Sequence, residues 1–168
     1  MMNFKKLLVT GISIVTAISA MSISASAKVE IPMENGAKLI VYEEGDTIPA
    51  LRATRSVPMV FSNTFPVYPS YNFVHGRDGD ESIPIYSHNT IRITFDERES
   101  SLYMNVYDSS LGEFVQIGSS QNSNGLHYIS NPSLVYDIEG LPAYHIYKIG
   151  FASRSQSQTI SGTITTTD

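Results

Sequence analysis

Apolar and polar residues alternate along two stretches in the second half of this chain, and that alternation limits the fold more than any other feature. A period of two residues is typical of β-strands with one buried face. Beyond residue 27, no stretch shows a convincing helical apolar period of about 3.6 residues, so we expect an all-β protein. One face carries Ile91, Ile93, Phe95, Leu102, Met104 and Val106, and the other carries Arg92, Thr94, Tyr103, Asn105 and Tyr107.

Further strands are indicated by β-branched residues and by the turn residues between them. On the last strand Ile160, Gly162, Ile164 and Thr166 share one face. Polar connections at 96–101 and 108–113 have hairpin length, and residues 144–152 and 159–166 are expected to pair as a final hairpin. We predict an antiparallel, jelly-roll-like β-sandwich of about eight strands, with a small barrel as the alternative. The expected strands are 38–42, 91–95, 102–107, 114–117, 126–129, 134–138, 144–152 and 159–166.

The N-terminus has the three parts of a bacterial secretory signal peptide. Lys5 and Lys6 precede a mostly apolar stretch at 7–20, and the small residues Ala25, Ser26 and Ala27 follow. A membrane anchor is the alternative, but the apolar stretch is shorter than the ~20 residues that cross a bilayer. We expect cleavage after Ala27 and a secreted, extracellular protein.

Three regions follow from this organisation. Residues 1–27 form the signal peptide, residues 28–56 an N-terminal strand and linker, and residues 57–168 the β-sandwich domain. Prolines exclude a helix from 57–73, so that segment is expected to be an edge strand or extended backbone. Cleavage after Arg55 would make 28–55 a pro-segment, and a first strand followed by a loop is the simpler interpretation.

Charge and cysteine content exclude several classes of function. The chain has no cysteine, which excludes disulfides, thiolate metal sites and cysteine nucleophiles. Loss of Lys5 and Lys6 with the signal peptide lowers the basic residues from 11 to 9 against 16 acidic ones, so the net charge moves from −5 to −7. Such a surface repels nucleic acid and anionic membranes.

Ten tyrosines make aromatic residues the most promising functional signal. Tyr103 and Tyr107 fall on the polar face of an expected strand, and Phe65, Tyr68 and Tyr71 cluster in the proline-rich segment. Aromatic faces presented to solvent bind sugars or peptides. These five residues are the candidate binding surface, and core and edge packing is the simpler interpretation.

Carboxylates at Asp78, Asp80 and Glu81 could hold calcium from a glycine-containing turn, although the spacing is not that of an EF-hand. A solvated turn is the alternative interpretation. His75 and His88 flank this turn and would supply a zinc site only if the fold brought them together. We therefore expect no cofactor, with calcium as the alternative.

Catalytic signals are weak. No Gly-x-Ser-x-Gly elbow is present, and an all-β pattern lacks the strand-turn-helix context of that motif. A pair of carboxylates for glycoside hydrolysis stays open, because residues that face each other across a sheet cannot be identified in one sequence. We assign no catalytic residue.

The second half also resembles the bacterial pre-peptidase C-terminal domains, which have a jelly-roll fold. The resemblance lies in the rhythm of residues 88–166, including 91–95, 102–110, 147–151 and the threonine-rich 159–166. It implies an exported accessory or binding fold and assigns no functional residue. We therefore expect a secreted, non-enzymatic binding protein whose partner is a polysaccharide or an extracellular protein. The alternatives are a small secreted hydrolase of glycan or peptide and an inhibitor of a secreted enzyme.

Overall fold

The computed structural model describes residues 28–51, 58–76, 82, 84–86, 90–99, 101–119, 122–130 and 133–167. These residues form twelve β-strands and one short 3-10 helix, η1 (Glu34–Gly36), and contain no α-helix. The predicted all-β fold is confirmed. Within the same ranges, no helix has the length and apolar character needed to cross a membrane.

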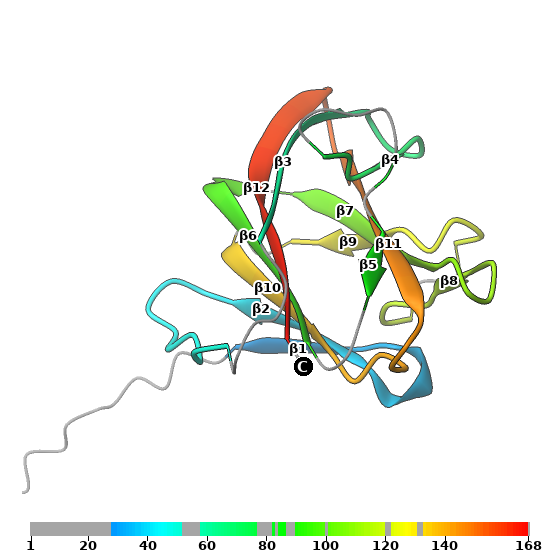
Figure 1. The fold of residues 1–168 in the computed structure, drawn as a ribbon. Helices are drawn as coiled ribbons and strands as arrows, with labels where there is room; N and C mark the ends of the chain where they lie inside the picture. Colours follow the sequence, from blue (N-terminus) through cyan, green and yellow to red (C-terminus); the bar gives the residue numbers. More distant parts are fainter. Residues whose placement is uncertain are drawn as a thin grey trace, which may run out of the picture.

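The first sheet has six strands in the order β1-β2-β10-β6-β12-β3, and all neighbouring pairs are antiparallel (Figure 1). Two long strands, β6 and β12, lie side by side in its interior. The bounds are β1 (Val29–Pro32), β2 (Lys38–Tyr42), β3 (Met59–Phe65), β6 (Thr90–Glu99), β10 (Ser133–Glu139) and β12 (Gln158–Thr167).

The second sheet is built around the antiparallel pair β7 (Leu102–Asp108) and β11 (Ile146–Ser153). Two short strands, β4 (Asn72–Phe73) and β5 (Ile85–Tyr86), pair with the other side of β11. β8 (Glu113–Val115) and β9 (His127–Ile129) pair with the other side of β7. The two antiparallel sheets pack face to face, which confirms the predicted β-sandwich.

The core lies between the two sheets and is filled by the residues that alternate in the sequence. Ile160, Gly162, Ile164 and Thr166 are all buried, as their shared face predicts. Phe151 of the second sheet contacts both Phe65 and Phe95 of the first, with ring centroids 5.3 and 5.4 Å apart. Each fully buried side chain of this size contributes about 1.5–3 kcal/mol to folding, so this packing holds the two sheets together. The inner faces also include Leu39, Val41, Phe61, Ile91, Ile93, Leu102, Met104, Val106, Tyr136, Ile138, Tyr147 and Ile149.

Two predicted hairpins are wrong. β11 and β12 belong to different sheets, and so do β6 and β7, so the chain crosses the sandwich at both connections. β6 also continues through most of the polar stretch 96–101, because its backbone still pairs with β10, where Glu99 lies opposite Ser133. Asp96 and Glu97 are exposed, so their polarity reflects solvent around the strand rather than a loop.

The N-terminal strands are part of the sandwich. β2 lies between β1 and β10 in the first sheet, so the described part of 28–56 is joined to 57–168 by backbone hydrogen bonds. β1 was not predicted, because Val29 and Ile31 give too short an alternation to identify a strand. The predicted signal peptide and the cleavage site after Arg55 lie outside the described residues.

Candidate functional site

Aromatic rings cover the outer face of the second sheet. They come from neighbouring strands, where Tyr107 lies opposite Phe114 and Tyr103 lies opposite Tyr128. Each of these ring pairs has centroids 5.0 Å apart. Such cross-strand aromatic contacts stabilise a sheet and also place the rings in one layer. We call this layer the aromatic surface; its seven rings are Tyr68, Tyr71, Phe73, Tyr103, Tyr107, Phe114 and Tyr128.

The segment between β3 and β4 supplies two of these rings. Its backbone is tied to the end of β11, since Tyr68 N donates to Ser153 O and Ser153 N donates to Pro66 O, at 3.0 and 2.8 Å. Tyr68 thereby stacks on Tyr103, with centroids 4.4 Å apart and planes 21° apart. Tyr71 contacts the rings of Phe73 and Phe114. The structure thus brings the predicted residues Tyr68, Tyr71, Tyr103 and Tyr107 onto one face.

Small residues beneath the rings make this arrangement fit. Gly150 faces outward on β11, and a Cβ there would lie 3.2 Å from Tyr71 Cδ2 and would collide with Asn105 Oδ1. Asn105 is fully buried under the rings, and its Nδ2 donates to Asn124 O at 2.8 Å. Its Oδ1 has no partner among the described residues. The close packing at Gly150 fixes where Tyr71 lies.

The predicted ring residues differ in exposure. Tyr68 is 38% exposed, whereas Tyr71, Tyr103 and Tyr107 are half-buried. Burial raises the pKa of Tyr71, so its hydroxyl stays protonated at neutral pH. Phe65 is fully buried in the core, and its assignment to the binding surface is therefore wrong. The reason is parity: Phe65 lies four residues after the inward-facing Phe61 on the same strand.

Two cations that the sequence analysis did not single out lie on the aromatic surface. Lys148 Nζ is 5.7 Å from the centroid of the Phe73 ring. The Arg154 guanidinium is 5.4 Å from the centroid of the Tyr128 ring, and its Nη1 donates to Tyr128 Oη at 3.0 Å. Lys148 lies opposite Tyr107 in the pairing of β11 with β7. The sequence does not show which strands pair, so it gave no signal that Lys148 would lie beside the rings.

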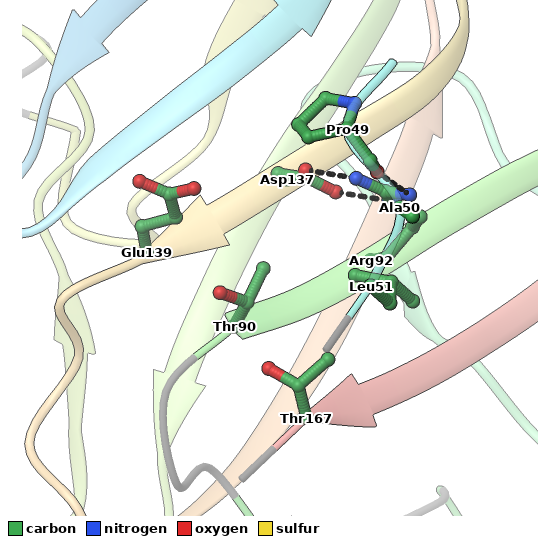
Figure 2. Close-up of a pocket in the computed structure, with 8 residues that line it drawn as sticks. All are labelled: Pro49, Ala50, Leu51, Thr90, Arg92, Asp137, Glu139 and Thr167. Atoms are coloured by element: carbon green, nitrogen blue, oxygen red, sulfur yellow. Dashed lines mark hydrogen bonds and ion pairs between the residues drawn. The ribbon is translucent and has the colours of Figure 1, made fainter. Parts of the chain in front are cut away.

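The first sheet carries a different feature, a hollow of about 300 Å³ on its outer face. Figure 2 shows Arg92 extended between Asp137 and the backbone of Pro49. Arg92 donates to both Asp137 oxygens at 2.7 and 2.6 Å, and Tyr42 Oη donates to Asp137 Oδ2 at 2.9 Å. Asp137 holds the pKa of Arg92 above its usual range. Arg92 Nη1 also donates to Pro49 O at 2.9 Å, so the cluster fastens the backbone at Pro49 to the sheet.

A histidine–carboxylate pair lies at the β7–β8 turn. His145 Nδ1 is 2.7 Å from Asp108 Oδ2, and Asp108 Oδ1 accepts the backbone N–H groups of Ser110 and Leu111. A catalytic triad would add a serine hydroxyl on the second ring nitrogen. Within the described ranges no serine hydroxyl hydrogen-bonds to His145, and the contacts of Asp108 Oδ1 are with the backbone of the turn.

The predicted calcium ligands Asp78, Asp80 and Glu81 lie outside the described residues, as does His88. His75 is described, and its backbone N–H donates to Asn63 Oδ1 at 2.9 Å. The described part of the chain contains no group of three or more histidines and carboxylates that could hold a metal ion. The calcium site therefore stays a prediction.

Comparison with known proteins gives no family for this chain. No family model matches it, and neither a curated protein nor a solved structure does. The resemblance to pre-peptidase C-terminal domains stays a prediction. The aromatic surface is the main candidate binding site on the described residues.

Proposed function

We propose that this protein is an exported, non-enzymatic β-sandwich that binds polysaccharide through the aromatic surface. The observation that carries the proposal is the stacked pair Tyr68 and Tyr103, which presents a partly exposed ring within a layer of seven. The apolar C–H face of a sugar ring stacks on such rings, and phenol hydroxyls can bond its hydroxyl groups. Exposed apolar patches of this kind mark ligand-binding sites.

The rings are also held in place before any ligand arrives. Tyr68 is anchored through its backbone to β11, and Tyr71 is held against Gly150 and Phe73. A binding surface that is already ordered loses less conformational entropy on binding, which favours affinity. Export through the predicted signal peptide at 1–27 would place this surface in the extracellular space, where polysaccharides are found.

The test is retention of purified protein on a panel of insoluble cell-wall and plant polysaccharides, with and without calcium. Tyr68→Ala should weaken retention about tenfold or more, because an exposed aromatic anchor carries much of such a binding energy. Tyr144→Ala is the matched control, since Tyr144 is 84% exposed and lies outside the aromatic surface. Calcium dependence would support the predicted ligands at 78, 80 and 81.

Tyr68→Phe separates the ring from its hydroxyl. Stacking needs the ring alone, so this variant should keep most of the binding that Tyr68→Ala loses. Near-ultraviolet circular dichroism of each variant checks that the fold is intact. Equal retention of wild type and Tyr68→Ala on every matrix would overturn the proposal.

A further inference from the structure

The five lysines and arginines whose side chains the structure describes fall into two groups, according to whether they pair with a carboxylate. Lys28, Lys38 and Arg92 all form ion pairs with carboxylates, the closest being Arg92 with Asp137 at 2.6 Å. Lys148 and Arg154 contact aromatic rings, as Arg92 also does with Tyr42, but neither forms an ion pair with a carboxylate among the described residues. Both of these cations lie on the aromatic surface.

Carboxylates are distributed in the opposite way. On the strands of the second sheet, the described ones are Asp108, which is buried against His145, and Glu113 at the start of β8. Asp137 and the other described carboxylates belong to the first sheet and its connections. The outward positions of β7 and β11 next to the rings are tyrosine, asparagine, lysine, glycine and alanine. Among the described residues, the aromatic surface thus carries local positive charge, on a chain whose net charge is −5.

We infer that the ligand of the aromatic surface is an anionic polysaccharide, with carboxylate or sulfate groups along its chain. This inference rests on the proposed function. The rings stack on the sugars, Lys148 pairs with an anionic group as a point charge, and the Arg154 guanidinium bonds one through its N–H donors. Their contacts with Phe73 and Tyr128 hold both cations beside the rings without neutralising them.

The charges on the two outer faces predict where an anionic polysaccharide would bind. An anionic chain that reached the first sheet would meet its carboxylates, whereas on the aromatic surface it meets cations that have no carboxylate partner among the described residues. Binding should therefore be restricted to one face and should weaken with salt, since exposed charges are screened within about 10 Å at 0.1 M salt.

The experiment compares matched polymers that differ only in charge: polygalacturonate with its methyl ester, and dextran sulfate with dextran. Affinity electrophoresis of the purified protein should show tighter binding to a charged member, by about tenfold at low salt, because charge-assisted hydrogen bonds are the stronger ones. Preference for polygalacturonate identifies carboxylate as the anion, and preference for dextran sulfate identifies sulfate. Lys148→Gln and Arg154→Gln should each remove much of the preference, and Lys28→Gln, an exposed cation paired with Glu30, is the control.

The outcomes separate this inference from the proposed function. Equal binding of the charged and neutral polymers, or a preference unchanged in both glutamine variants, overturns the anionic ligand and leaves polysaccharide binding intact. Binding to none of the four polymers, together with Tyr68-dependent retention on another neutral polysaccharide, also overturns it. Loss of Tyr68 dependence on every matrix overturns the proposed function as well.

Discussion

The outer faces of the two sheets cover the same core and use their side chains in opposite ways. On the first sheet, polar groups bond one another: Arg92 with Asp137 at 2.6 Å, and Ser161 with Ser62 at 2.7 Å. On the second sheet, Tyr68 stacks on Tyr103 and keeps part of its ring open to solvent, and Lys148 has no carboxylate partner among the described residues.

This contrast indicates which face can bind a ligand. A buried polar group whose hydrogen bonds are satisfied inside the protein gains nothing from a ligand, and separating it from its partners costs energy. Exposed ring surface and a cation without a carboxylate partner still have contacts to gain. The first face should therefore respond to mutation through stability, and the second mainly through binding.

The largest expected effect is on the first sheet. Asp137→Ala leaves the Arg92 guanidinium and the Tyr42 hydroxyl without their acceptor, and it should lower the free energy of unfolding by about 3–5 kcal/mol. Urea denaturation measures this loss. Replacing both partners, as Arg92→Met with Asp137→Leu, should cost much less, because no buried charge remains unpaired. If Asp137→Ala lowers the free energy of unfolding by less than about 1 kcal/mol, the cluster does not stabilise the first sheet.

The next largest effect is expected when a side chain is added at Gly150, beneath the rings. Gly150→Ala should displace Asn105 and Tyr71, lower the free energy of unfolding by about 1–3 kcal/mol, and weaken polysaccharide retention. Gly162→Ala is the matched control on the first sheet, where the new Cβ meets the backbone of Thr94. It should lower stability and leave retention per folded molecule unchanged. Equal retention of both variants would remove the distinction between the two faces.

A smaller effect is the coupling between stacked rings. A double-mutant cycle of Tyr68→Ala and Tyr103→Ala should give a coupling energy of about 0.5–1.5 kcal/mol in stability, as aromatic pairs do. Because Tyr68 is partly exposed, its single variant should change stability little while it removes binding. If both single variants unfold the protein without a specific binding defect, the rings are packing alone.

The smallest expected effect is on pH dependence. Burial lowers the pKa of His127 in the second sheet, so the unfolded chain takes up a proton before the folded one does. The free energy of unfolding should therefore fall as the pH drops below about 6.5, the ordinary histidine value. His127→Gln should flatten this slope between pH 7 and pH 5. Arg92 and Tyr42, whose pKa values are both raised, stay protonated over that range. If His127→Gln leaves the slope of unfolding free energy against pH unchanged, other groups cause the acid response.

Local alternation predicted which way side chains point. The inward face of residues 159–166 and the outward positions of Tyr103 and Tyr107 follow from a period of two, because neighbours in a strand must alternate. Phe65 follows the same rule, and its assignment to the binding surface failed because it was grouped with the segment after β3. It is the last residue of β3, and its alternation with Phe61 places it in the core.

The local sequence pattern did not predict which strands pair with each other. The length of a polar connection allows a hairpin or a crossing between sheets, and the chain crosses between β6 and β7 and between β11 and β12. Which one occurs depends on where each apolar face finds the most burial, and that depends on the whole core.

An all-β sandwich and the outward positions of Tyr103 and Tyr107 follow from the sequence alone, because side-chain alternation acts between neighbouring residues. Only the tertiary structure decided that Arg92 and Asp137, 45 residues apart, bond each other, and that Lys148 and Arg154 lie beside the rings. Those contacts join segments distant in sequence, and strand register and sheet packing place them together.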